Sequence, residues 1–420
     1  MNVLKGYKET EIGLLPTDWE LKSVGTHCIV KARIGWQGLR SDEYLSSGKY
    51  GLITSTDIVD GRVNWGSCCF VSKSRYLQDS NIIVREDDTL VSKDGTIGKV
   101  GIVQNIPFPS TLNSGVFVIR PKFDDIYKKY LAFAFKSVYF QDFINRLTAG
   151  STIVHLYQKD IVNFKFPVPP PLEQRAIAEV LSDVDGLIGA LDKKIAKKRL
   201  LKQGAMQQLL TGKKRLHGFT DKWVEITFRE YVDIYRGGSP RPIESYITDS
   251  PNGVNWIKIG DVKPNDKYIN KTEERIIPDG VSRSRRVDVG DFILSNSMSF
   301  GRPYILGIDG CIHDGWLVIQ NYHNSFDKDY LYYLLCSEDV MMQYIGMAAG
   351  SSVKNLNKEK VASLQLCVPT TIEEQQAIAT ILSDMDKEIA DLEAQRDKYR
   401  LLKSGMMQKL LTGQIRLKTK

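Results

Sequence analysis

The chain contains 420 residues, of which 42% are hydrophobic and 25% are charged, and its formal net charge is +7. These values exclude a single small domain and a disordered chain, and the mild positive charge is compatible with nucleic-acid binding without indicating it. The sequence has no run of about 18 apolar residues and no signal-peptide core, so we predict a cytoplasmic protein without a membrane span. Its six cysteines form no CxxC pair and are expected to be free thiols.

The first globular domain is predicted over residues 1–168, with an α/β or α+β fold. Short β-rich runs alternate there with Gly, Asp and Asn turns, at residues 50–58, 81–87 and 115–121. One amphipathic helix is expected over residues 127–146.

A central spacer helix is predicted next, over residues 169–213. A proline triplet at its beginning stops the preceding strand and suits a helix start, and Gly212 suits a helix end. Apolar residues recur in steps of four and three, which is the heptad pattern of a coiled coil. The predicted seam residues are Ile177, Leu181, Val184, Ile188, Leu191 and Ile195.

The second half of the chain repeats the first. Residues 374–417 match residues 173–216 without a gap at an offset of 201, and about 25 of the 44 positions are identical. The match continues with small changes of offset into the globular part, where Trp223 corresponds to Trp19. The predicted segments of this half are a second globular domain over 214–368, a distal spacer helix over 369–413 and a basic tail over 414–420.

The second copy also repeats the expected elements. Its β-rich runs and its amphipathic helix are predicted at residues 254–262, 291–296, 315–320 and 329–345. A capping-box spacing, Thr370 with Glu373 or Thr371 with Glu374, precedes its long helix. The seam residues of that helix are Ile378, Leu382, Met385, Ile389 and Leu392.

Two amphipathic helices of about 40 residues, each about 60 Å long at 1.5 Å per residue, need a partner for their apolar stripes. The simplest arrangement packs them against each other, and a two-fold relation between the copies makes the pair an antiparallel coiled coil. The alternative is that each helix docks on its own domain. A chain with internal two-fold symmetry suits a partner with the same symmetry, such as duplex DNA.

The sequence contains no recognisable catalytic or cofactor-binding motif. The segment 95–100 is too short for a Walker A loop, the five histidines have no metal-ligand spacing, and no GxSxG elbow occurs. The carboxylates near Lys93 in residues 86–95 resemble a nuclease metal site, but such charge clusters are usually solvated turns. These absences favour a non-catalytic binding protein without metal or cofactor over an enzyme with an unrecognised site.

The repeated motifs resemble those of the DNA-specificity subunits of type I restriction–modification enzymes. The resemblance rests on the duplicated helix end LLKxGxMQxLLTGxxRL, on the PxEQxAIA helix start and on LPTDWE near the N-terminus. It covers nearly the whole chain and is strongest in the helices. The second copy departs from the helix-start motif, because Thr371-Ile372 replaces Pro171-Leu172.

The resemblance implies two target-recognition domains, each recognising one half of a split site in double-stranded DNA. It also implies that the helices set the spacer and dock two modification (methyltransferase) subunits, with restriction subunits joining the complex. In such complexes S-adenosylmethionine binds the modification subunit and ATP the restriction subunit, so neither cofactor is expected on this chain. The alternative function is a pseudo-symmetric protein-binding scaffold without a role on DNA.

Candidate DNA-binding residues are long polar side chains and cations in loops, because Arg or Lys pairs with guanine, Asn or Gln with adenine, and cations with phosphates. Those in the first domain are Arg33, Trp36, Gln37, Arg40, Lys73, Arg75, Lys93, Thr96, Lys99, Ser151 and Thr152. Those in the second domain are Arg236, Ser239, Arg241, Arg283, Arg285, Arg286, Ser295, Asn296, Ser297, Arg302, Ser351, Ser352 and Lys354.

The LLTG ends of the two long helices have two possible roles. They are expected either to form a docking surface for a partner subunit or to pack as ordinary helix ends.

Overall fold

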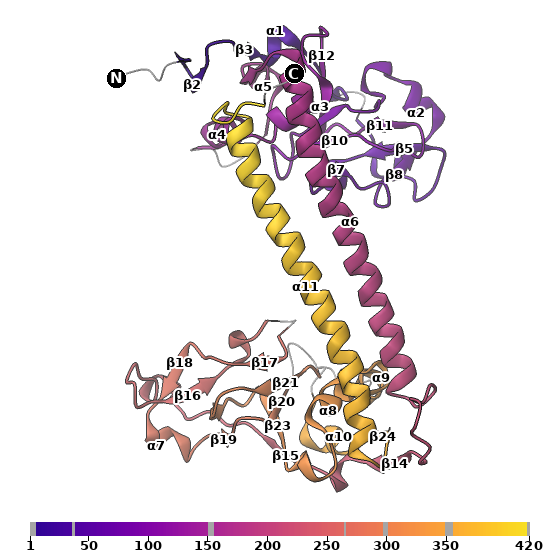
Figure 1. Cartoon of the computed structure of the whole chain (residues 1–420), viewed down its shortest axis with the longest axis vertical. Coiled ribbons are helices and arrows are strands. Elements are labelled where there is room, and N and C mark those ends of the chain that lie inside the picture. Colours follow the sequence, from indigo (N-terminus) through magenta and orange to yellow (C-terminus); the bar gives the residue numbers. More distant parts are fainter. Residues whose placement is uncertain are drawn as a thin grey trace. The chain divides into compact units, whose positions relative to one another are not determined.

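The computed structural model describes residues 6–35, 38–149, 155–263, 266–296, 301–348 and 356–417. The chain divides into two compact units, one made of Met1–Leu191 with Gln395–Lys420 and the other of Asp192–Ala394. Each long helix, α6 (Pro171–Leu209) and α11 (Ile372–Leu410), therefore contributes one half to each unit (Figure 1). Unit 1 and unit 2 contain equivalent elements in circularly permuted chain order.

Unit 1 is built on a six-stranded sheet of order β4-β12-β9-β10-β7-β6 and a three-stranded sheet of order β11-β5-β8, and two strand pairs, β1-β2 and β13-β3, complete it. Its strands are β1 (Tyr7–Thr10), β2 (Gly13–Pro16), β3 (Glu20–Ser23), β4 (Cys28–Lys31), β5 (Tyr50–Ile53), β6 (Ile58–Val59), β7 (Arg62–Val63), β8 (Cys69–Val71), β9 (Thr89–Ser92), β10 (Val100–Ile102), β11 (Ser110–Leu112), β12 (Val116–Pro121) and β13 (Lys165–Val168). Its short helices are α1 (Val24–His27), α2 (Lys73–Leu77), α3 (Lys128–Ala134), α4 (Val138–Thr148) and α5 (Gln158–Ile161).

Unit 2 repeats this plan with a five-stranded sheet of order β15-β23-β20-β21-β17, a four-stranded sheet of order β18-β16-β22-β19 and the pair β14-β24. Its strands are β14 (Val224–Thr227), β15 (Asp233–Arg236), β16 (Val254–Ile257), β17 (Tyr268–Ile269), β18 (Glu274–Ile276), β19 (Arg285–Val287), β20 (Phe292–Ser295), β21 (Pro303–Leu306), β22 (Gly310–Ile312), β23 (Trp316–Gln320) and β24 (Gln365–Val368). Its short helices are α7 (Pro278–Val281), α8 (Lys328–Leu335), α9 (Glu338–Ala348) and α10 (Lys358–Ala362).

The mixed α and β composition expected from the sequence is confirmed, and three of the predicted elements are wrong. Residues 81–87 form no strand, because a 3-10 turn, Ser80–Ile82, precedes a single bridge from Ile83 to Thr111. The helix predicted over 127–146 is two helices, α3 and α4. The chain turns at Ser137, whose hydroxyl donates to the Ala134 carbonyl at 2.6 Å, and such local bonds compete with helix continuation.

The same break occurs in unit 2, where the helix predicted over 329–345 is α8 and α9. Ser337 separates them, and its hydroxyl oxygen accepts the backbone N–H of Val340 at 3.3 Å. A serine hydroxyl in this position satisfies a backbone donor at the first turn of the new helix.

The two long helices run antiparallel within each unit. In unit 2 the ammonium of Lys202 contacts the carboxylate of Asp386, and that of Lys198 contacts Glu388. Residue numbers therefore increase along one helix in the direction in which they decrease along the other. In unit 1 Lys403 contacts Asp185 at 2.6 Å, which is the Lys202–Asp386 pair repeated at an offset of 201. The predicted antiparallel coiled coil is confirmed.

Charge specifies this orientation. Residues 171–191 of α6 carry four carboxylates and one cation, and residues 192–209 carry one carboxylate and six cations. In α11, residues 372–394 carry seven carboxylates and one cation, and residues 395–410 carry one carboxylate and five cations. Antiparallel packing places each acidic half against a basic half, whereas parallel packing would oppose like charges.

The predicted seam has two functions along each helix. Ile177 and Leu181 are fully buried in the core of unit 1, together with Leu410 and Leu411 from the end of the other helix. Further along, where the helices pack on each other, Ile188 and Leu191 are half-buried and Ile195 is buried. The helices therefore both dock on their own domain and pack on each other, so the two packing alternatives coexist.

A buried glutamate joins the three parts of each unit. The carboxylate of Glu173, on the first turn of α6, accepts from the Trp19 indole at 3.1 Å and from the Arg416 guanidinium at 2.7 and 2.8 Å. In unit 2 Glu374 accepts in the same way from Trp223 at 3.2 Å and from Arg215 at 2.8 Å. The repeated tryptophan, glutamate and arginine thus join the residue before a strand, the first turn of one long helix and the segment after the other.

Candidate nucleic-acid interface

The loop of residues 313–315 in unit 2 connects β22 of the four-stranded sheet to β23 of the five-stranded sheet. The backbone at Gly237 passes so close that an added Cβ would lie 2.0 Å from the His313 carbonyl oxygen, so only glycine fits there. The N–H of Gly237 donates to the Trp316 carbonyl at 2.9 Å, and that of Gly238 donates to Ile312 at 3.1 Å. These contacts hold the segment after β15 against the 313–315 loop.

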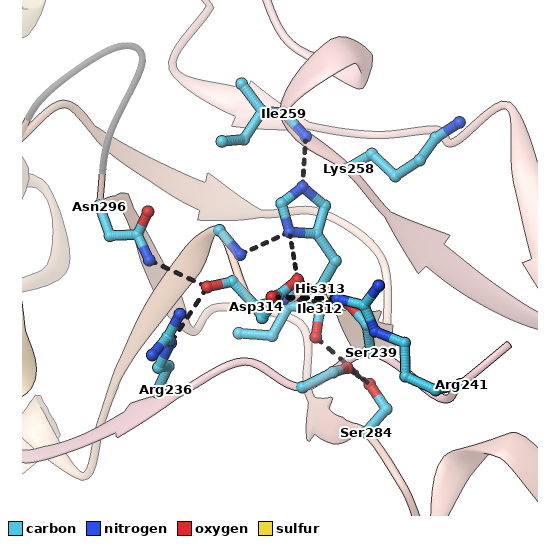
Figure 2. A network of polar contacts seen from close by, with 12 residues as sticks. Arg236, Ser239, Arg241, Lys258, Ile259, Ser284, Asn296, Ile312, His313 and Asp314 are labelled. Atoms are coloured by element: carbon cyan, nitrogen blue, oxygen red, sulfur yellow. Dashed lines mark hydrogen bonds and ion pairs between the residues drawn. The ribbon is translucent and has the colours of Figure 1, made fainter. Parts of the chain in front are cut away.

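Four predicted DNA-binding residues gather around Asp314 (Figure 2). The Ser239 hydroxyl donates to Oδ1 of Asp314 at 2.7 Å, and the Arg241 guanidinium lies 3.6 Å from Oδ2. The Asp314 carbonyl accepts from Arg236 Nε at 3.2 Å and from Asn296 Nδ2 at 2.9 Å. Residues that are distant in the sequence thus form one cluster of donors, in which Arg236 and Arg241 are exposed, Ser239 is half-buried and Asn296 is buried.

His313 supports this loop with its ring. Its Nδ1 accepts the backbone N–H of Gly315 at 2.6 Å, and its Nε2 faces the N–H of Ile259 at 3.4 Å. Burial lowers the pKa of His313, and the nearby Asp314 carboxylate opposes this effect. The neutral imidazole is the form that can accept from Gly315.

The three arginines near β19 form a second group, stabilised by aromatic rings. The Arg285 guanidinium lies 4.7 Å from the ring centre of Tyr235, and that of Arg283 lies 5.7 Å from Tyr246. Arg286 lies 3.8 Å from the Asp309 carboxylate, an exposed pair of low energy. All three arginines are exposed, so their charges are accessible to a polyanion.

Two other predicted residues of unit 2 lie away from the Asp314 cluster. The Ser295 side chain is fully buried in the sheet. Arg302 lines a groove of about 1460 Å³ together with Tyr332 of α8, Cys336 just after α8 and Lys202 of α6.

The predicted residues of unit 1 are divided between the interior and the surface. Arg33 is 1% exposed and donates from Nε to the Leu112 carbonyl at 2.9 Å. Arg75 forms a two-point contact with Glu43, at 2.6 and 2.9 Å. The structure therefore uses both arginines to hold loops together.

The remaining described candidates of unit 1 stay closer to solvent. Lys73 is exposed on α2, and Arg40 and Thr96 are exposed in turns. The Lys93 ammonium lies 5.3 Å from the ring centre of Phe117, and Lys99 is half-buried. Eight further candidates lie outside the described residues: Trp36, Gln37, Ser151, Thr152, Ser297, Ser351, Ser352 and Lys354.

Asp314, His313 and Tyr235 were missed by the sequence reasoning. The available signal was the alignment of Gly115 with Gly315, which places Asn113 opposite His313 and Ser114 opposite Asp314. In unit 1 the side chain of Asn113 accepts the Gly115 N–H at 2.7 Å, as His313 does for Gly315. The loop geometry is therefore repeated with different side chains.

Within the described parts of the chain no group of three or more His, Cys, Asp or Glu side chains is placed to hold a metal ion. Among the same residues no helix combines the length and apolarity required to cross a bilayer.

Comparisons with known proteins agree on one family. The model of the type I restriction modification DNA specificity domain matches twice, at residues 16–198 and 220–399, which together are most of the chain. A putative type I restriction enzyme specificity subunit, MjaX of Methanocaldococcus jannaschii, is 27% identical over 99% of this chain and 98% of its own.

Two solved structures share the fold. The crystal structure of the type I restriction–modification S subunit from M. genitalium matches with a TM-score of 0.59 and 15% identity, over 98% of both chains. A chain from a structural study of complex assembly and conformational transition in the type I system matches with a TM-score of 0.61 and 16% identity. That match covers 96% of this chain and 99% of the other.

Proposed function

Because this chain belongs to the family of type I restriction–modification DNA specificity subunits, we propose which of its residues contact DNA and its partner subunits. The chain is a non-catalytic DNA-recognition subunit, and each globular domain recognises one half of a bipartite site. This membership disfavours the scaffold without a DNA role. We place the protein in the cytoplasm, where its DNA and its partners are.

In the second domain the exposed donors around Asp314 contact base edges. Arg236 and Arg241 carry the side-chain chemistry that pairs with guanine in the major groove. Asn296 is 5% exposed and supports the loop by donating to the Asp314 carbonyl. The convergence of these residues from β15, the following loop and the end of β20 is the observation that supports the proposal. The exposed arginines 283, 285 and 286 contact phosphates and position the domain.

In the first domain the proposed contacts are the exposed or half-exposed Arg40, Lys73, Thr96 and Lys99, together with Lys93. Arg33 and Arg75 are left out, because the first is buried and the second is paired with Glu43. The helix pair sets the number of untouched bases between the two half-sites.

Paired substitutions test this division of roles. Arg285→Ala with Arg286→Ala is expected to weaken binding to every duplex alike and to lower the slope of log Kd against log salt by roughly 2, at about 0.9 per phosphate contact. Arg241→Ala is expected to relax discrimination at the second half-site only, by roughly tenfold. The measurements are equilibrium DNA binding across a salt series and genome-wide mapping of methylated positions.

The exposed Arg229, in the 3-10 turn Phe228–Glu230, supplies the control variant Arg229→Ala in the same unit. If the Arg285/Arg286 double variant and Arg241→Ala both leave the affinity and the methylation pattern at their wild-type values, these assignments are wrong. Loss of binding by the control as well would indicate a general charge effect instead.

The partner surface on the helices is the repeated pair of exposed leucines. Leu200 and Leu401 are 69% and 76% exposed, at equivalent positions of the two copies. The LLTG ends instead pack in the cores of their units through Leu210 and Leu411. Solvent-exposed leucines that occur once per unit at the same helical position suit two copies of one partner.

We assign that partner as the modification subunit, one copy on each unit, with restriction subunits joining through the complex. S-adenosylmethionine and ATP would then be held by those partner subunits. The two leucine positions have the outward orientation that docking of a second protein requires.

A further inference from the structure

Asp314 is a carboxylate at the centre of the donor cluster that we propose for the second half-site. A negative charge at this place opposes binding of a polyanion, so its presence requires a reason. The inference below rests on the proposed function and assigns a role to this carboxylate within the same site.

The two carboxylate oxygens of Asp314 have different surroundings. Oδ1 accepts the Ser239 hydroxyl at 2.7 Å, which fixes the side chain. Oδ2 lies 3.6 Å from the Arg241 guanidinium, too far for a direct hydrogen bond, and the Arg241 side chain is 77% exposed. Within the described residues no other side chain is bonded to Oδ2, so this oxygen can accept a donor from outside.

Asp314 is ionised at neutral pH. The hydrogen bond from Ser239 lowers the pKa of its carboxyl, and burial opposes this shift. The charge offsets that of Arg241 in the free protein. An exposed ion pair of this length is worth little, so a ligand exchanges with it readily.

We propose that Asp314 is a specificity-determining residue of the second domain, which accepts an amino group of a base and rejects phosphate. The amino group is N4 of cytosine or N6 of adenine, the donors that the major groove presents to a carboxylate. A duplex with guanine or thymine at this position presents acceptors instead of a donor and so leaves the negative charge of Asp314 uncompensated. The cost of that mismatch discriminates against it, as an unpaired polar group does in any desolvated interface.

The first domain lacks this feature in its equivalent loop. Ser114 stands opposite Asp314 in the alignment, and its hydroxyl donates to the Asn113 side chain at 3.0 Å. The nearest carboxylate there is Asp94, which comes from another loop, contacts His155 and lies beside Gly115. The two domains therefore discriminate by different means, and removing the charge should affect one half-site.

The test uses the full chain assembled with its modification subunits and the variant Asp314→Asn, which keeps the shape and an acceptor for Ser239. The probes are a duplex with the site found by methylation mapping and duplexes in which one half-site is scrambled. Affinity for the duplex with a scrambled second half-site is expected to rise roughly fivefold, the effect of one like charge about 4 Å from a phosphate in water. Discrimination at that half-site falls, and discrimination at the first half-site does not change.

A second variant and a charge control complete the design. Asp314→Ser gives this loop the residue of the first domain and removes the carboxylate. It should lower sequence discrimination at the second half-site by roughly tenfold. Glu230→Gln removes an exposed carboxylate of the same unit, in the 3-10 turn Phe228–Glu230, and should leave discrimination unchanged.

Three outcomes would overturn the proposal: unchanged discrimination in both Asp314 variants, equal loss of affinity for all duplexes, or the same gain of non-cognate affinity in Glu230→Gln. Failure of the proposed function is distinguishable from these, because the wild-type complex would then show no sequence-selective binding at all.

Discussion

Replacement of Glu173 by Gln is expected to destabilise unit 1 strongly for so small a change. The carboxylate is 3% exposed and accepts four hydrogen bonds, from the indole of Trp19, two guanidinium nitrogens of Arg416 and the backbone of Leu417. A carboxamide keeps the shape, loses the charge and turns one acceptor into a donor that faces other donors.

The magnitude follows from what Arg416 retains. Breaking a buried ion pair costs about 3–5 kcal/mol, because one charge stays behind without a partner. The Arg416 side chain is 35% exposed and keeps two contacts to Asp18, at 2.6 and 2.9 Å, so solvent and Asp18 offset part of that cost. We expect a loss of about 2 kcal/mol in the free energy of unfolding.

Differential scanning calorimetry measures the effect. For a unit of about 200 residues the melting temperature falls by roughly 2–4 °C per kcal/mol, so a decrease of about 4–8 °C is expected. Glu374→Gln should have a similar effect on unit 2, where Arg215 and Trp223 replace the donors. Hydrogen exchange locates each loss of protection in its own unit.

Glu179→Gln is the matched control, because this residue is exposed on the same helix and undergoes the same chemical change. A melting temperature of Glu173→Gln within 1 °C of wild type would refute the reasoning, and so would an equal decrease for Glu179→Gln.

Three further predictions concern the helices and acid stability. Leu200→Lys with Leu401→Lys should abolish co-purification with the modification subunits while melting stays unchanged; retained co-purification would move the docking surface elsewhere. Lys202→Asp should cost about 1 kcal/mol in a denaturant titration, and the double exchange with Asp386→Lys should restore most of it; full additivity of the two single losses would contradict the pairing. The contact with Arg416 lowers the pKa of Asp18 below its ordinary 3.8. The contribution of Asp18 to the free energy of unfolding is therefore fully present above that value and is lost as the pH falls through the folded pKa. Unfolding of Asp18→Asn by acid should lack this loss of stability.

Helix length, direction and partner were accessible from the sequence. The heptad steps that end at Ile195 and Leu392 predict two long amphipathic helices, and the duplication at an offset of 201 gives both a similar pattern. Opposite charge on the two halves of each helix then permits only the antiparallel pairing without repulsion. These properties are local and periodic, so a linear pattern contains them.

The candidate site was only partly accessible in the same way. A polar residue in a loop was predicted to face DNA, yet Arg33 donates to the Leu112 carbonyl inside unit 1, and Arg302 lies beside α8. Conversely, Asp314 was passed over although Ser239 and Arg241 converge on it.

The sequence by itself therefore determined the duplication, the helix pair and the family, because side chains three, four or seven residues apart must share one helix face. Only the tertiary structure decided which polar side chains reach the surface. A loop side chain takes its direction from packing between strands that are distant in the chain, and no spacing in the sequence records that packing.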